Sequence, residues 1–344
     1  MELTGQVFAV QANFYRVKLD EPCHNVDTLL CVRRARLKKI GQQVWVGDRV
    51  VITEPDWQGQ RGAIAEVLPR RNYLERPGIA NIDRVILMFS CQILDPVQIS
   101  RFLVYSEYLQ TEILLCLNKR DLIDDQTWQE WHDRLSSWGY EPLPLSVEQG
   151  EGIDCLEKRI SKGVSILCGP SGVGKSSLIK YLLPQLPIGV GTVDPKLGRG
   201  RHTTRHVELF EVPGGGKLAD SPGFIQPALP MGCRELGQCF PEIRRQLQDK
   251  QCEFSDCLHR EEPGCQVSKD WERYEHYCQF LAEVQEQESR QAMTATPDDP
   301  LKVKKRSGGR TIVEPRLNPK KYRAVSRRQL VQSLEADLEG TGQP

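Results

Sequence analysis

The stretch GPSGVGKS, residues 169–176, decides the fold of the largest part of this chain. It sets two glycines, a lysine and a serine at the spacing of a phosphate-binding loop, and it lies between the apolar run VSILC and the segment SLIKYLL. A strand, a loop and a helix in this order direct backbone amides toward phosphate oxygens, where the helix dipole favours negative charge. The stretch therefore predicts an α/β domain that binds a nucleoside phosphate.

Other residues complete the predicted phosphate site. Lys175 would neutralise the outer phosphates, and the hydroxyl of Ser176 would bind the Mg²⁺ that accompanies the nucleotide. The later segment DSPG offers a carboxylate near Mg²⁺ and a glycine amide for the γ-phosphate, and Thr203 or Thr204 of GRGRHTTRH could close over the metal. We assign Mg²⁺ to Ser176 and Thr204. The expected nucleotide contacts here are Gly169, Pro170, Ser171, Gly172, Val173, Gly174, Lys175, Ser176, Ser177, Asp220 and Gly223.

A second motif, NKRD at residues 118–121, ends the apolar run EILLCL. The carboxylate of Asp121 can accept hydrogen bonds from N1 and the exocyclic amine of guanine, and adenine offers no donors at those positions. Asn118 can contact the base and tie the loops together, and the aliphatic stem of Lys119 can lie along the ring. The motif therefore predicts the binding of GTP and GDP.

The order of these motifs is unusual. In an ordinary GTP-binding domain the base-reading motif follows the phosphate loop. Here NKRD and the Ser146 segment PLSVEQGEG come first, and the switch threonines and DSPG follow the loop. This order results if the ends of such a domain are joined and a new break is opened elsewhere, which leaves the folded topology intact. The sequence therefore predicts a circularly permuted P-loop GTPase domain.

The flanking segments predict further domains. Residues 1–72 hold five short β-forming runs between Gly, Asp and Pro, which favours a closed barrel of the oligonucleotide-binding (OB) type that would bind RNA. Residues 73–232 alternate apolar strands with helical segments and would form the GTPase domain. Residues 233–295 predict a mainly helical module around a Cys/His loop, and residues 296–344 a basic, partly disordered tail.

The Cys/His loop has the sequence QCEFSDCLHREEPGC. Three cysteines and a histidine within fourteen residues suit tetrahedral Zn²⁺, and four protein ligands leave no open position, so the predicted site is structural. Cys239 and Cys278 lie nearby and are alternative ligands.

Composition favours a cytoplasmic protein with a polyanionic partner. No apolar run is long enough to cross a membrane, the N-terminus lacks the features of a signal peptide, and the twelve cysteines are scattered along the chain. The net charge is zero, yet residues 32–43 carry five Lys/Arg and no acid, and residues 302–328 carry eleven against one. Either run alone fits a solvated surface; together they favour a polyanionic partner.

On these motifs the chain resembles the circularly permuted GTPases and, within them, the ribosome small subunit-dependent GTPase A (RsgA) family, over nearly its whole length. The resemblance implies the small ribosomal subunit and its rRNA as partners and a function in late maturation of that subunit; we expect a monomer. It also implies that Ser146 lies in a guanine-contacting segment and that one Zn²⁺ is bound by Cys252, Cys257, His259 and Cys265. One departure is Val147, where the family usually has alanine.

The resemblance also bears on hydrolysis. Phe224 stands after Gly223, where many GTPases have a glutamine that orients the attacking water. The resemblance implies that His202 takes over this function, beside the catalytic Lys175, Thr203 and Thr204. Such a switch predicts slow hydrolysis that the subunit stimulates. The alternatives are a non-catalytic RNA-binding protein regulated by guanine nucleotide and a metabolic kinase, which NKRD disfavours.

Overall fold

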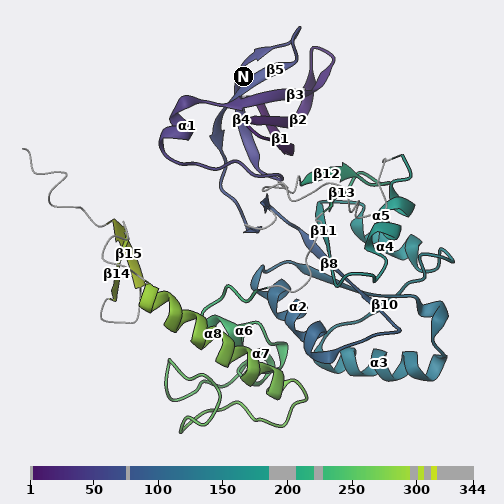
Figure 1. Ribbon diagram of the computed structural model, residues 1–344, viewed down its shortest axis with the longest axis vertical. Helices are drawn as coiled ribbons and strands as arrows, with labels where there is room; N and C mark the ends of the chain where they lie inside the picture. The colour runs from purple at the N-terminus through teal and green to yellow at the C-terminus, as the bar shows by residue number, and fades with distance from the viewer. Residues whose placement is uncertain are drawn as a thin grey trace, which may run out of the picture. The chain divides into compact units, whose positions relative to one another are not determined.

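Figure 1 shows the computed structural model of the protein, which describes residues 3–74, 78–185, 207–220, 228–294, 301–305 and 311–315. The chain divides into two compact units, Met1–Val284 and Gln285–Pro344. Among the described helices, none combines the length and the apolar character needed to cross a membrane.

The N-terminal strands close a five-stranded barrel. They pair in the order β1-β2-β3-β5-β4, and β4 pairs back with β1. The pairing of β3 with β5 is parallel and the other pairings are antiparallel. The strands are β1 (Leu3–Gln11), β2 (Phe14–Cys23), β3 (Val26–Arg33), β4 (Arg49–Asp56) and β5 (Arg61–Val67). The predicted OB-type barrel is confirmed.

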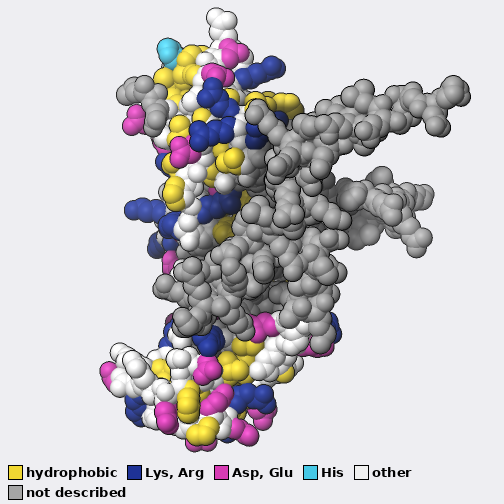
Figure 2. Space-filling model, turned by 90° about the vertical axis from the view of Figure 1, so that its left-hand side faces the viewer, with side chains coloured by type: hydrophobic (Ala, Val, Ile, Leu, Met, Phe, Trp, Pro, Cys, Tyr) yellow, Lys and Arg dark blue, Asp and Glu magenta, His cyan; other side chains and the backbone are white. Residues whose placement is uncertain are grey.

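Side-chain alternation explains the core of this barrel. Residues at every second position point inward, and they include Val7, Val17, Leu29 and Ile64, which are fully buried. The first basic run covers the end of β3 and a short helix, α1 (Ala35–Lys39), that the sequence did not predict. Five residues are too few to show a helical period. In Figure 2, Lys and Arg side chains lie among hydrophobic and acidic ones on the visible face of the barrel.

The central domain is built on six strands in the order β10-β9-β8-β11-β13-β12, which belong to an 11-stranded sheet that continues through β1 into the barrel. All neighbouring pairs are parallel except β12 with β13, which form an antiparallel hairpin. The strands are β8 (Arg84–Ser90), β9 (Glu112–Asn118), β10 (Leu143–Pro144), β11 (Val164–Cys168), β12 (Glu208–Glu211) and β13 (Lys217–Asp220). The helices are α2 (Pro96–Tyr108), η1 (Arg120–Leu122), α3 (Asp125–Trp138), α4 (Ile153–Ile160) and α5 (Lys175–Leu182).

Helices cover both faces of this sheet. Leu87 and Phe89 of β8 pack in the same cluster as residues of α2 and α3, and the alternate residues Ile86 and Met88 pack with residues of α4 and α5. A strand buried on both faces carries a continuous apolar run, which is the pattern that IDRVILMFS shows. The order of the strands places β9 and β11 on either side of β8. The base-reading motif and the phosphate loop therefore lie side by side at the carboxyl ends of the parallel strands, although their order along the chain is reversed.

The C-terminal part of the first unit is mainly helical, as predicted. Helices α6 (Cys233–Gln238), α7 (Pro241–Gln246) and the start of α8 (Tyr274–Thr294) enclose an aromatic core that includes Phe240 and Tyr277. A buried ion pair between Arg273 and Glu242, 2.6 Å apart, ties the segment before α8 to α7.

Two short ribbons complete the described chain. Strands β6 (Tyr73–Leu74) and β7 (Ile79–Ala80) pair in the segment that connects the barrel to the central sheet. Strands β14 (Leu301–Lys305) and β15 (Thr311–Pro315) pair antiparallel within the basic tail, so this part of a segment predicted to be partly disordered has regular structure.

Candidate active site and metal centre

The phosphate loop follows β11 and leads into α5. Gly169, Gly172 and Gly174 all have positive φ angles, of 147°, 80° and 104°. A Cβ atom on Gly169 would lie 2.1 Å from the carbonyl oxygen of Met88, and one on Gly174 would lie 2.4 Å from Nδ2 of Asn118. The loop is therefore held against β8 and β9 so closely that only glycine fits at these two positions.

Asn118 joins three loops. It ends β9, and its side chain is 3% exposed. Its Nδ2 donates to the carbonyl oxygen of Val173 in the phosphate loop at 2.8 Å, and its Oδ1 accepts from the amide of Val147 at 3.1 Å. A buried amide with both ends paired fixes the positions of its partners, because breaking either bond leaves a buried polar group unsatisfied.

The guanine motif and the Ser146 segment form one corner. Lys119 has a left-handed backbone with φ of 63°, which turns the chain from β9 into η1 and carries the exposed Asp121 past the end of the strand. The amide of Arg120 donates to the carbonyl oxygen of Leu145 at 3.0 Å. Ser146 is buried, and its hydroxyl accepts from the amide of Gln149 at 3.2 Å. Backbone and side-chain bonds thus shape this corner from two distant segments.

Lys175 is the first residue of α5. Its Nζ donates to the carbonyl oxygen of Gly169 at 2.8 Å and also to that of Pro170. Burial lowers the pKa of Lys175, since desolvation disfavours the ammonium form. A phosphate oxygen at this loop would offset that effect by accepting from the ammonium group. Ser171, Ser176 and Ser177 are exposed, so their hydroxyls are accessible to a ligand.

The remaining predicted residues lie after the loop. Asp220 ends β13, and its backbone is paired opposite Glu208 of β12. His202, Thr203, Thr204 and Gly223 lie outside the described residues, so their assignments stay predictions.

The metal centre brings together the four expected residues. One ligand atom from each of Cys252, Cys257, His259 and Cys265 lies within 4.8 Å of the others. The three Sγ atoms lie 3.6, 3.6 and 3.7 Å from Nδ1 of His259. Zn–S bonds of about 2.3 Å and a Zn–N bond of about 2.0 Å at tetrahedral angles predict S···N separations of about 3.5 Å, so the arrangement fits zinc.

Neighbouring groups support this arrangement. Glu262 accepts from the amides of Leu258 at 2.9 Å and Arg260 at 2.8 Å, which fixes the backbone on both sides of the histidine. Burial lowers the pKa of His259, which favours the neutral imidazole that a metal ligand requires. Burial raises the pKa of the Cys257 thiol to about 12, so its thiolate form needs a nearby cation. Cys239 and Cys278 do not belong to the cluster.

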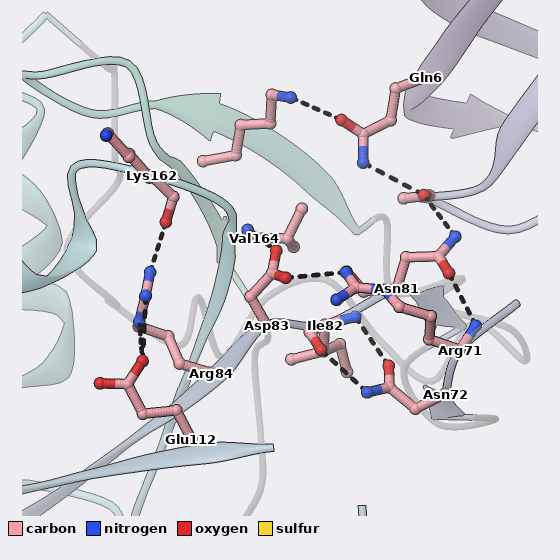
Figure 3. Close-up of polar contacts among 12 residues, drawn as sticks. Gln6, Arg71, Asn72, Asn81, Ile82, Asp83, Arg84, Glu112, Lys162 and Val164 are labelled. Carbon is pink, nitrogen blue, oxygen red and sulfur yellow. Dashed lines mark hydrogen bonds and ion pairs between the residues drawn. The ribbon is translucent and has the colours of Figure 1, made fainter. Parts of the chain in front are cut away.

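Sequence reasoning missed the partners of Asn118 and the contact between the barrel and the central domain. The carbonyl of Val173 and the amide of Val147 are backbone groups, and no residue type signals them. Figure 3 shows the contact between the barrel and the central domain, where Asn81 and Asp83 follow the β6–β7 ribbon. Asn81 donates to the carbonyl oxygen of Gly47 at 3.1 Å, and Asp83 accepts from the amide of Val164 at 2.7 Å, so the connecting segment is bonded to the barrel and to β11.

Comparisons with known proteins agree with this geometry. A family model described as RsgA GTPase matches residues 67–230. The chain is 50% identical to a small ribosomal subunit biogenesis GTPase RsgA of Trichormus variabilis, covering 97% of this chain and 96% of the relative. It is 51% identical to that of Thermosynechococcus vestitus, with coverages of 98% and 97%.

Two solved structures share the architecture. YjeQ from Thermotoga maritima is 30% identical with a TM-score of 0.68, over 83% of this chain and 99% of that chain. YloQ, described as a circularly permuted GTPase, is 28% identical with the same TM-score, over 83% and 96%. The circular permutation inferred from the order of the motifs therefore matches a solved relative.

Proposed function

Because the chain belongs to the RsgA family of small ribosomal subunit biogenesis GTPases, we propose that it binds the small ribosomal subunit and its rRNA, hydrolyses GTP when that subunit stimulates it, and acts in the late maturation of the subunit. The observation that carries this proposal is the 2.8 Å bond from Asn118 to the carbonyl oxygen of Val173, which makes the guanine motif and the phosphate loop one site. GTP favours the subunit-bound state, and hydrolysis favours release.

Guanine selection rests on the corner around Asn118. Asp121 follows the turn at Lys119 and is exposed, so its carboxylate is accessible to N1 and the exocyclic amine of the base. Lys119 lies along the base, and the segment at Ser146 offers it a backbone amide. Because Asn118 positions both neighbouring loops, the base and the phosphates are bound in a fixed relation to each other.

Hydrolysis uses residues that follow this corner. Lys175 exchanges its loop carbonyls for the outer phosphates, and the amides of Gly172, Val173, Gly174, Lys175, Ser176 and Ser177 surround them. Ser176 and Thr204 would hold the Mg²⁺, which would neutralise phosphate charge; Asp220 would supply a carboxylate near the metal, and the amide of Gly223 would face the γ-phosphate. His202 orients the attacking water, and Thr203 and Thr204 close over the site.

The other domains supply binding to the subunit. We divide the chain into a barrel at 1–72, the GTPase domain at 73–232, a zinc module at 233–295 and a basic tail at 296–344. The barrel, module and tail contact rRNA, with affinity from the two basic runs. Cys252, Cys257, His259 and Cys265, whose ligand atoms lie close together, would hold one structural Zn²⁺ that shapes the module. We place this activity in the cytoplasm, in a monomer.

The test compares GTP hydrolysis with and without purified small subunits. The parent protein should hydrolyse GTP slowly alone and faster with subunits. His202→Ala should bind GTP and the subunit as the parent does and lose roughly 10²- to 10⁴-fold of the stimulated rate, the usual effect of removing a positioned catalytic group.

His132→Ala is the matched control, since His132 is a histidine of the same domain that pairs with Glu141 on the surface. It should keep the stimulated rate. GTP binding by the parent without hydrolysis on subunits would favour a non-catalytic RNA-binding protein regulated by nucleotide. Full stimulation of the His202 variant would assign the water to another residue.

A further inference from the structure

The barrel is joined directly to the hairpin that carries Asp220. Ala9 of β1 pairs antiparallel with Glu208 of β12, and Glu208 in turn pairs with Asp220 of β13. Neighbouring strands lie about 4.8 Å apart, so about 10 Å separates the barrel strand from the backbone of Asp220. A shift of β12 relative to the barrel therefore moves the backbone at the start of DSPG.

Ion pairs surround this joint. Arg16 of β2 lies 2.7 Å from Glu208, and Lys18 of β2 pairs with Glu211 at the other end of β12. Lys217 of β13 donates to Oε1 of Gln6 in β1 at 2.6 Å, and Figure 3 shows Gln6 reaching out from the barrel. Polar side chains thus attach the hairpin to the barrel, beside the buried apolar packing of Phe8 and Leu209. We call these three contacts, with the Ala9–Glu208 pairing, the barrel–hairpin contact.

Arg16 and Lys18 also belong to a second surface. They alternate along β2 with buried residues and share its outward face with Phe14, whose side chain is 50% exposed. The facing residues of β3 are Leu30 and Val32, which are 44% and 40% exposed. Exposed apolar and aromatic groups beside cations form a surface suited to unpaired nucleotides, and this face of OB barrels is where oligonucleotides bind. Arg16 and Lys18 therefore have two possible anionic partners.

We propose that Glu208 and Glu211 compete with RNA phosphates for Arg16 and Lys18, so that docking of the barrel on rRNA releases the β12–β13 hairpin and permits faster GTP hydrolysis. This inference rests on the proposed function and adds a route by which the subunit stimulates it. In the free protein the two carboxylates occupy the cations and restrain the hairpin. On the subunit the phosphates take their place.

The strength of the contact suits such an exchange. The side chains of Arg16 and Glu208 are 48% and 30% exposed, and those of Lys18 and Glu211 are 35% and 49% exposed. Exposed ion pairs contribute little net stability, whereas several phosphates along a strand release counterions when cations bind them. A cavity of about 360 Å³ lined by Gln6, Arg49, Arg71, Asp83 and Lys217 lies beside the contact. Phe8 of β1 and Leu209 of β12 also pack in one buried cluster, so the exchange frees the hairpin from its ion pairs and leaves this apolar packing in place.

The test replaces the carboxylates by amides of the same shape. The double variant Glu208→Gln/Glu211→Gln should hydrolyse GTP without subunits roughly two- to tenfold faster than the parent and bind the subunit more tightly by a similar factor, as expected for the loss of two exposed pairs. The matched control is Glu112→Gln, whose carboxylate pairs with Arg84 inside the GTPase domain and is 50% exposed. It should change neither quantity.

A second double variant distinguishes the release of a restraint on the hairpin from a general loss of structure. Arg16→Gln/Lys18→Gln also breaks the contact, so its basal rate should rise as well, but its affinity for the subunit should fall because the phosphate ligands are lost. Equal GTP affinity in all variants shows that the nucleotide site is intact. Unchanged basal rates in both double variants would overturn the inference. If subunits fail to stimulate even the parent, the proposed function is wrong, and the basal rates still test the restraint.

Discussion

The guanine corner, which NKRD and the Ser146 segment form around Asn118, and the barrel–hairpin contact both join segments that are far apart in sequence. They do so by opposite means. In the corner, one side chain that is 3% exposed, Asn118, binds two backbone groups. In the barrel–hairpin contact, side chains that are between 30% and 49% exposed form ion pairs across the joint. Buried polar groups are costly to leave unpaired, whereas exposed ion pairs exchange readily with water and salt.

This difference indicates which parts of the molecule are fixed and which can be released. In the proposed function the corner holds the base and the phosphates in one arrangement, and the buried bonds of Asn118 suit that task. The barrel–hairpin contact is suited to change when a partner binds. The Cys/His loop at Cys252–Cys265, called the zinc loop below, is the strongest case of a fixed region, because four side chains that can bind a metal meet at one point.

The largest effect is expected at the zinc loop. Cys257→Ser removes one of four ligands, and structural zinc contributes about 10–16 kcal/mol of apparent binding free energy in small zinc domains, so the loop around Cys252–Cys265 should lose its fold. Metal analysis should find about one Zn²⁺ per parent chain and far less in the variant. Hydrogen exchange should show lost protection in residues 250–270 only.

The exposed cysteine Cys155 gives the matched control, since Cys155→Ser should keep both the metal and the protection. The GTP affinity should be unchanged in both variants, because the guanine corner contains no residue of the zinc loop. A folded, zinc-free parent protein would show that the cluster is not a metal site. A loss of GTP affinity in the Cys257 variant would show that the two regions depend on each other.

The next largest effect is expected in the guanine corner. Asn118→Ala leaves the carbonyl of Val173 and the amide of Val147 without their partner, at a cost of about 2–4 kcal/mol, which corresponds to roughly 30- to 1000-fold weaker GTP binding. Titration with a fluorescent guanine nucleotide measures it. Asn72→Ala is the control, since Asn72 also bonds backbone through both ends of its amide, accepting from the amide of Ile82 and donating to the carbonyl oxygens of Ile82 and Leu109. It should lower thermal stability and keep nucleotide affinity; equal losses of affinity would mean that Asn118 acts through general stability.

The sequence predicted the regions that local patterns encode. The five barrel strands, the doubly buried β8 and the phosphate loop each carry a continuous signal. The Cys/His spacing predicted a metal site, and the family resemblance selected the four residues that the fold brings together. The reversed order of NKRD and the phosphate loop predicted a permuted domain, because both motifs must lie at the same ends of neighbouring strands to bind one nucleotide.

The sequence did not predict contacts between distant segments. Arg16 and Glu208 are 192 residues apart, and neither lies in a motif. Which of the many surface charges pair depends on how the barrel and the sheet come together. The contacts between them include the pairing of Ala9 with Glu208, the bonded segment at Asn81 and the packing of Phe8 in the central core. Helix α1 was missed for a different reason: its five residues are too few to show a helical pattern in the sequence.

The smallest effect is expected from salt, in an experiment that compares the guanine corner with the barrel–hairpin contact. Raising NaCl from about 0.05 to about 0.5 M shortens the Debye length to about 4 Å, which weakens exposed ion pairs and leaves buried hydrogen bonds nearly unchanged. Hydrogen exchange of the parent protein without nucleotide should then show roughly two- to fivefold less protection of the β12 amides, as expected for the loss of exposed pairs. The amide of Val147, which donates to the buried Asn118, should exchange at the same rate in both salts. Glu208→Gln/Glu211→Gln should remove the salt effect on β12, because its pairs with Arg16 and Lys18 are already lost. Equal salt effects at β12 and Val147 would mean that burial does not distinguish the two regions, and the barrel–hairpin contact would then not be the part that the subunit releases.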